Sequence, residues 1–183
     1  METIAKRCLS LILMTTCLIL VHHQTAAAKE LKGKKLIEKV CADTPDKAAC
    51  IKVLSSDPTS AKASLTDLAM MSLKMAAANA TGILTDAKMM IDNPDLDPDV
   101  QQGLADCKET LLDAEGQLED TVAALLSGAK HDAQLWLRAA LAAIDTCDAS
   151  IPGADDVLSK KSVGFRQLCN IALAISKALA HES

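Results

Sequence analysis

Residues 100–128, VQQGLADCKETLLDAEGQLEDTVAALLSG, carry the pattern that decides the fold. Apolar or small side chains recur at steps of three and four residues, which is the spacing of one face of an α-helix. Gly128 is a residue suited to ending that helix. The pattern predicts one long helix with a buried stripe made of Val100, Leu104, Cys107, Leu111, Ala114, Leu118, Thr121 and Leu125.

Similar stripes on either side predict further helices. The second of two short helices is expected to start at Thr44, with Pro45 as its first helical residue. Short turns between long helices favour an up-down-up-down bundle. We therefore predict an all-α fold, in which a helical hairpin (residues 29–57) precedes a four-helix bundle (residues 58–183). The helices are expected over residues 30–40, 44–54, 58–92, 98–127, 132–148 and 160–180.

Composition supports this fold class and excludes some partners. Aromatic content is 1%, supplied by Trp136 and Phe165, whereas the helix formers Ala and Leu are abundant. The chain carries a formal net charge of −5. A protein this acidic is not expected to bind nucleic acid through a general positive surface.

The N-terminus has the pattern of an export signal. Lys6 and Arg7 precede an apolar run over residues 8–21, and residues 26–28 are all Ala, a small-residue cleavage site. The run is shorter than the roughly 20 residues that span a bilayer, so a retained membrane anchor is the weaker alternative. We expect residues 1–28 to be a signal peptide, residues 29–183 to be a secreted domain, and no membrane association.

Five cysteines remain in the expected mature chain. Cys41 and Cys50 flank the connection between the two short helices, and Cys107 and Cys147 fall in the buried stripes of neighbouring bundle helices. Bridges within these two pairs would suit the predicted fold, although spacing alone leaves other pairings open. Cys169 is interpreted as a buried free thiol, with an intermolecular bridge as the alternative.

No pattern typical of catalysis or of metal or cofactor binding is found. His131 and His181 have no metal-ligand spacing, and no phosphate-binding loop or nucleophile motif occurs. We expect a binding module rather than an enzyme, with no cofactor. Asn79-Ala80-Thr81 is an N-glycosylation sequon whose amide is expected to reach solvent.

Four blocks of the sequence resemble the plant invertase and pectin methylesterase inhibitor family. They are CADTPDKAAC (residues 41–50), ADCKE (105–109) with Asp113, WLRAAL (136–141) with Thr146-Cys147, and the C-terminal stretch 168–175. The resemblance implies disulfides Cys41–Cys50 and Cys107–Cys147 and secretion to the plant cell wall, or apoplast. It also implies a monomer that inhibits its enzyme in a 1:1 complex.

The resemblance favours pectin methylesterase as the partner. Invertase inhibitors of the family present a Pro-Lys-Phe motif, and the corresponding stretch here, residues 127–132, reads SGAKHD. Glu109, Asp113 and Thr146 match polar positions of the esterase-inhibiting branch, and we expect Asp148 to extend the same acidic face. Leu111 departs from the family because Tyr is common there.

Three alternatives remain open at this point. The chain could inhibit cell-wall or vacuolar invertase, or it could be a non-inhibitory member of the family with a signalling or allergen-like role. It could also carry a small apolar ligand, although such carriers usually have more cysteines and a shorter chain.

Overall fold

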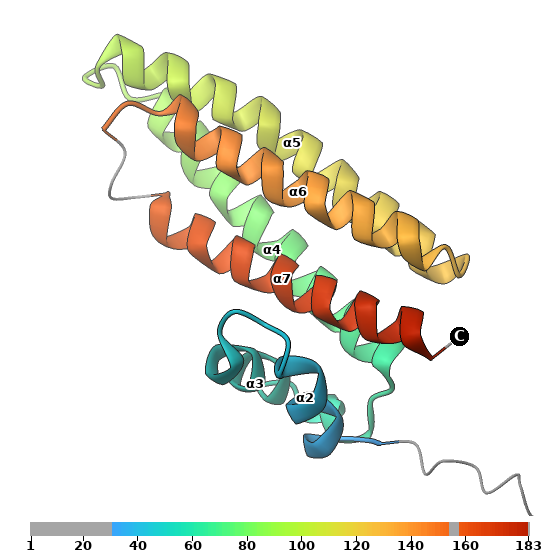
Figure 1. Cartoon of the computed structure of the whole chain (residues 1–183). Coiled ribbons are helices and arrows are strands. Elements are labelled where there is room, and N and C mark those ends of the chain that lie inside the picture. Colours follow the sequence, from blue (N-terminus) through green and yellow to red (C-terminus); the bar gives the residue numbers. More distant parts are fainter. Residues whose placement is uncertain (1–30, 154–157, 183) are drawn as a thin grey trace, which may run out of the picture. The chain divides into compact units, whose positions relative to one another are not determined.

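The computed structural model describes residues 31–153 and 158–182. These residues belong, apart from the first, to one compact unit that spans Lys32–Ser183. Throughout the described ranges the regular structure is helical, with six α-helices and one 3-10 helix and no strand (Figure 1). The predicted all-α fold is confirmed. The predicted signal peptide, residues 1–28, lies outside the described residues.

The N-terminal hairpin consists of α2 (Lys34–Cys41) and α3 (Lys47–Ser55). A disulfide joins Cys41 to Cys50 across the turn. The start of α3 differs from the sequence prediction, which placed Pro45 inside the helix. Asp46 is the N-cap, and its carboxylate accepts a hydrogen bond from the Ala49 N–H at 2.9 Å. The helix therefore begins two residues later than Pro45, and Thr44 donates to the Cys41 carbonyl at the end of α2 instead.

The first bundle helix also starts later than predicted. Asp57 caps a short 3-10 helix, η1 (Pro58–Lys62), and the backbone then becomes extended at Ala63. Helix α4 (Leu65–Ile91) begins after Ser64, which forms a capping box with Asp67. The caps at Asp57 and Ser64 therefore divide residues 58–92, which the sequence analysis predicted as one helix, into η1 and α4.

The other three bundle helices are α5 (Pro98–Leu126), α6 (Lys130–Ser150) and α7 (Ser159–His181). Gly128 ends the α5 region with a φ of +79°, a conformation that suits glycine. The Gly128 N–H donates to the Leu125 carbonyl and the Ala129 N–H to the Ala124 carbonyl, which is the Schellman arrangement. The predicted role of Gly128 is confirmed.

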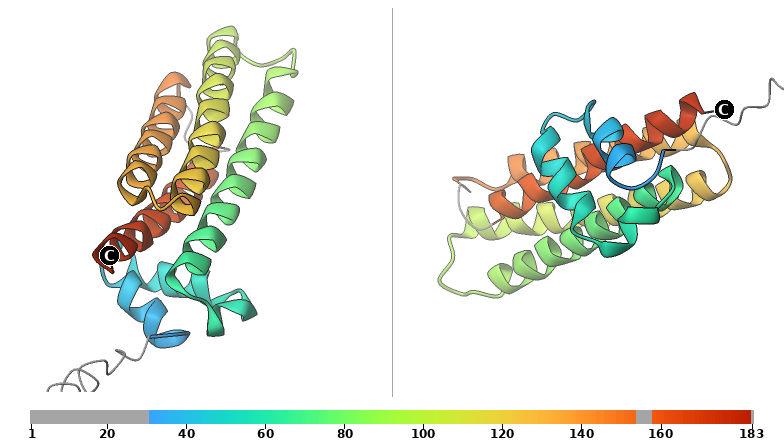
Figure 2. Two further views of the ribbon diagram at one scale, coloured as in Figure 1. Left: turned by 90° about the vertical axis from the view of Figure 1, so that its right-hand side faces the viewer. Right: turned by 90° about the horizontal axis from the view of Figure 1, so that it is seen from below.

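The four long helices form a closed ring of neighbours, α4–α5–α6–α7 and back to α4 (Figures 1 and 2). Alanines with no exposed surface, such as Ala76 and Ala140, allow the helices to approach closely. The hairpin packs against α7 and α4. The core is filled by large side chains of every bundle helix, including Leu68, Leu73, Ile83, Leu104, Leu111, Leu137, Ile144, Phe165, Ile171 and Ile175.

Candidate functional site

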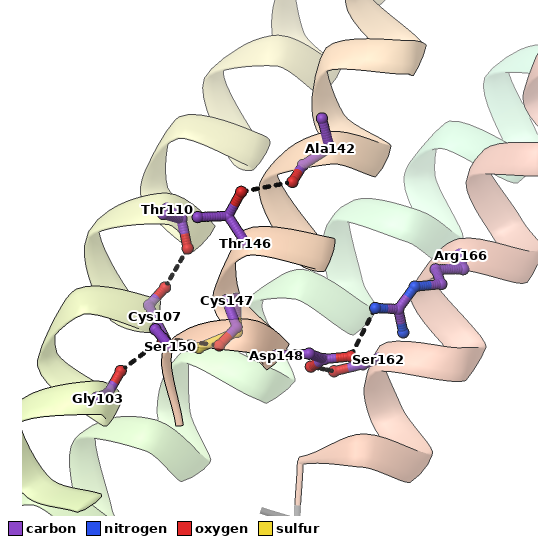
Figure 3. The surroundings of a disulfide bond; sticks show 10 residues. All are labelled: Gly103, Cys107, Thr110, Ala142, Thr146, Cys147, Asp148, Ser150, Ser162 and Arg166. Atoms are coloured by element: carbon purple, nitrogen blue, oxygen red, sulfur yellow. Dashed lines mark hydrogen bonds and ion pairs between the residues drawn. A yellow bond between two sulfur atoms is a disulfide. The ribbon is translucent and has the colours of Figure 1, made fainter. Parts of the chain in front are cut away.

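Helices α5 and α6 are joined more closely than ordinary packing requires (Figure 3). Cys107 and Cys147 form a disulfide with their Cα atoms 3.9 Å apart. The Ser150 hydroxyl donates to the Gly103 carbonyl at 2.8 Å. A Cβ at Gly103 would overlap the Ser150 carbonyl oxygen, so only glycine permits this approach. These contacts set an antiparallel register, with residue 103 opposite 150 and residue 107 opposite 147.

Three of the predicted partner-binding residues lie on exposed positions of this helix pair. Glu109 and Asp113 are exposed and stand one helical turn apart on α5. Thr146 is exposed on α6, and the register brings it level with Lys108, one residue before Glu109. Figure 3 shows Thr110 and Thr146 on the same side of the two helices. We call Glu109, Thr110, Asp113 and Thr146 the acceptor face.

Hydrogen bonding within the helices gives this face its chemical character. The Thr146 hydroxyl donates to the Ala142 carbonyl at 2.9 Å, and the Thr110 hydroxyl donates to the Cys107 carbonyl at 2.9 Å. Both hydroxyl protons are therefore used internally, and the oxygens remain available as acceptors. The Glu109 carboxylate has 69% of its side-chain surface exposed and lies 3.1 Å from the Lys108 amine. The face is thus suited to a partner that supplies hydrogen-bond donors or positive charge.

Asp148 does not belong to the acceptor face. It accepts hydrogen bonds from the Ser162 hydroxyl at 2.7 Å and from the Arg166 guanidinium at 2.6 Å, and its side chain is only 31% exposed. Figure 3 shows Asp148 pointing toward α7, on the opposite side of α6 from Thr146. The prediction of one acidic face that includes Asp148 is wrong, because two residues along a helix turn a side chain by about 200°.

Arg166 links α7 to α6 through two carboxylates. Its Nε atom lies 2.7 Å from Asp145, in addition to the contact with Asp148. Partial burial opposes the charge of Arg166, but hydrogen bonds to Asp145 and Asp148 outweigh that effect and raise the pKa of the guanidinium. Asp148 therefore has a structural role at the α6–α7 boundary, which the sequence analysis missed. The sequence contained one indication of this role, because Arg166 is the single Arg of the last helix and directly follows Phe165, which is buried.

Cys169 is buried on α7 as a free thiol. Burial raises its pKa to about 12, because the thiolate would lose its hydration. At neutral pH the group is a neutral, inaccessible thiol.

The Asn79 sequon lies on α4 where this helix packs against α7. Asn79 Oδ1 is buried without a hydrogen-bond partner, and Nδ2 lies 3.2 Å from the position that a Cβ on Gly164 would occupy. The sequence analysis expected the Asn79 amide to reach solvent, but the Oδ1 atom of this amide is buried. A glycan would attach through Nδ2, the atom that lies beside Gly164 of α7.

Other parts of the described ranges offer no second chemical centre. No group of three or more His, Cys, Asp or Glu within them could hold a metal ion. None of the helices there has the length and apolarity needed to cross a membrane. An open groove of about 420 Å³ lies between α4 and α5, lined by Met70, Leu73, Lys74, Ala77, Thr81, Glu115, Leu118, Glu119 and Val122.

Comparison with known proteins gives related sequences that are named as enzyme inhibitors. A pectinesterase inhibitor from Actinidia deliciosa is 29% identical over 149 residues, which cover 79% of each chain. A putative invertase inhibitor from Platanus orientalis is 29% identical over 133 residues, covering 71% of this chain and 78% of the relative.

Solved structures agree with the sequence relatives. A mutant form of a pectin methylesterase inhibitor from Arabidopsis superposes with a TM-score of 0.69 at 30% identity, over 77% of this chain and 95% of the other. A second inhibitor structure, from Arabidopsis thaliana, gives a TM-score of 0.60 at 28% identity, over 79% and 96% of the two chains. The model of the plant invertase/pectin methylesterase inhibitor family matches residues 35–175, and the chain belongs to that family.

Proposed function

We propose that this protein is a secreted inhibitor of pectin methylesterase, which it blocks by covering the active-site cleft in a 1:1 complex. The observation that carries the proposal is the acceptor face on the disulfide-joined α5–α6 pair, in a chain related to a pectinesterase inhibitor. A helix pair held at this register is pre-organised, so little conformational entropy is lost when a partner binds to it.

Electrostatics explains why an acidic surface suits this partner. Pectin methylesterase acts on a methyl-esterified polygalacturonate chain, whose free carboxylates make the chain a polyanion. Groups in the enzyme cleft that accept such a chain would also favour the carboxylates of Glu109 and Asp113. Charges at the rim mainly govern association rate and specificity, whereas buried apolar contacts contribute most of the affinity.

The proposed location is the plant cell wall. Disulfides such as Cys41–Cys50 and Cys107–Cys147 persist in oxidising, extracellular compartments. The export-signal pattern over residues 1–28 supports the same location.

Inhibition of acid invertase is the second candidate, because two relatives from Platanus species are named putative invertase inhibitors. The α5–α6 turn argues against it. Residues 127–132 read SGAKHD there and lack the Pro-Lys-Phe motif that the resemblance associates with invertase inhibitors.

A parallel titration tests the proposal. The refolded mature domain is added in increasing amounts to purified plant pectin methylesterase and to cell-wall invertase, at mildly acidic pH. We expect esterase activity to fall linearly to an end point at one equivalent, with invertase activity unchanged. Loss of invertase activity alone would support the second candidate, and loss of neither by a correctly disulfide-bonded monomer would contradict both.

A further inference from the structure

The α5–α6 pair exposes an aromatic side chain close to the acceptor face. Trp136 is the one tryptophan of the chain, and 37% of its surface is exposed. Leu135, its neighbour on α6, is 53% exposed. Tryptophan gains more from burial than most side chains, so leaving it partly in water at a surface position forgoes a large apolar stabilisation.

The helix geometry places Trp136 on the α5 side of α6. Cys147, which faces α5 through the disulfide, is 11 residues farther along, and at about 100° per residue this separation leaves the two side chains within about 20° of each other. Leu137, the next residue, is fully buried, whereas Trp136 is partly exposed, so Trp136 lies at the edge of the buried stripe of α6.

The register relates this position to the acceptor face. Residue 107 lies opposite 147, so residues 117 and 118 lie level with 136 and 137. Trp136 is therefore about one helical turn from the level of Asp113 and about three turns from that of Thr146, on the same helix pair. Trp136 therefore lies on the same helix pair as the two carboxylates and the two hydroxyl acceptors of the acceptor face.

This composition matches the organisation of protein–protein interfaces. The few residues that contribute most of the binding energy are enriched in Trp, Tyr and Arg, and polar groups surround them at the rim. We propose that Trp136, supported by Leu135, is the apolar anchor through which the α5–α6 pair binds pectin methylesterase, with the acceptor face as its polar rim. This inference rests on the proposed function and adds the residue that would determine affinity.

Substitution tests the anchor directly. Trp136→Ala is expected to raise the inhibition constant for pectin methylesterase at least about 30-fold, as for residues at the centre of an interface. Leu135→Ala should give a smaller increase. Met89→Ala is the matched control, because Met89 is 62% exposed on α4, away from this surface, and it should leave inhibition within about twofold of wild type. Thermal unfolding of each variant identifies any loss caused by misfolding.

A measurement without mutation complements the variants. Because the chain has one tryptophan, incorporation of 5-fluorotryptophan gives one ¹⁹F resonance in the mature domain. We expect this resonance to shift on addition of one equivalent of unlabelled enzyme.

The possible outcomes separate the two claims. If wild type inhibits the esterase but Trp136→Ala inhibits equally well, or the ¹⁹F resonance is unchanged in a complex detected by gel filtration, the anchor is wrong and the proposed function stands. If wild type does not inhibit any pectin methylesterase tested, the proposed function fails, and the anchor fails with it.

Discussion

The α5–α6 pair and helix α7 are held in the same bundle by different means. Between α5 and α6 there is a covalent bond and a backbone approach that only glycine allows at residue 103. Helix α7 instead holds its neighbours through long charged side chains. Lys161 lies 2.5 Å from Asp86 of α4, and Arg166 binds Asp145 of α6. Arg166 also binds Asp148 of α6 (Figure 3).

The difference shows where the molecule is built to be rigid. Both regions share the apolar core, so the contrast lies in the contacts added to it. A disulfide and close packing do not respond to salt, whereas partly exposed ion pairs weaken as ionic strength rises. The proposed binding surface lies on the covalently joined pair, which is the arrangement expected for a surface that must keep its shape when it binds.

Removal of the α5–α6 disulfide should have the largest effect on stability. The double variant Cys107→Ser/Cys147→Ser is expected to lose about 4 kcal/mol of unfolding free energy, because a 40-residue loop is released in the unfolded chain. Equilibrium unfolding in urea measures the change. Cys41→Ser/Cys50→Ser, which opens a loop of only nine residues, is the control and should lose about 3 kcal/mol. A larger loss of unfolding free energy in the hairpin variant than in the α5–α6 variant would contradict this prediction.

The close approach at Gly103 should give the next largest effect. Gly103→Ala places a methyl group against the Ser150 carbonyl and is expected to cost about 2 kcal/mol. Gly116→Ala on the same helix is the matched control, since a Cβ there meets no atom within 4 Å. That variant should gain about 0.5–1 kcal/mol from the higher helix propensity of alanine. Equal effects of the two substitutions would show that α5 and α6 are not closely packed at this point.

Loss of the α7 ion pairs should cost less and depend on salt. Arg166→Gln is expected to reduce the unfolding free energy by about 1 kcal/mol, because the guanidinium and Asp148 are each about one-third exposed. The difference from wild type should shrink between about 0.1 M and about 1 M NaCl, as screening weakens the pairs. Urea unfolding at both salt concentrations measures this. A difference that does not change with salt would mean that Arg166 acts through packing alone.

The smallest expected effect concerns Cys169, which reports on opening of α7. In the native state the buried thiol should resist alkylation by iodoacetamide at about pH 8 and react readily once urea unfolds the chain. Because burial raises the folded pKa to about 12, the thiol also disfavours the folded state as pH rises above its unfolded value of 9.0. Cys169→Ala should remove this contribution to the loss of folding stability at alkaline pH. Rapid native alkylation, monitored by mass spectrometry, would show that α7 opens readily.

Much of the fold could be predicted from the sequence because helices are local structures. The stripe of residues 100–125 and the capping signal of Gly128 predicted α5 closely. Helix starts were less accurate where several caps compete. Asp46 and Ser64 are N-caps that lie near proline signals, and only the hydrogen bonds show which residue begins the helix.

The site was predicted less completely because it depends on contacts between helices. Glu109, Asp113 and Thr146 are exposed as expected for the proposed role. The pairing of Asp148 with Arg166 could not be foreseen, since the two residues are 18 positions apart and their contact depends on how α6 and α7 pack. For the same reason the sequence did not reveal that Asn79 packs against α7.

The most direct test of the α5–α6 surface is the double charge reversal Glu109→Lys/Asp113→Lys, assayed for inhibition of pectin methylesterase and for thermal unfolding. A second double variant, Asp92→Lys/Asp95→Lys, makes the same change in net charge at exposed positions of the α4–α5 turn. We expect the acceptor-face variant to inhibit at least about tenfold more weakly at unchanged melting temperature, and the control to inhibit like wild type. Equal inhibition by the two variants would contradict the proposal that the enzyme binds at this surface.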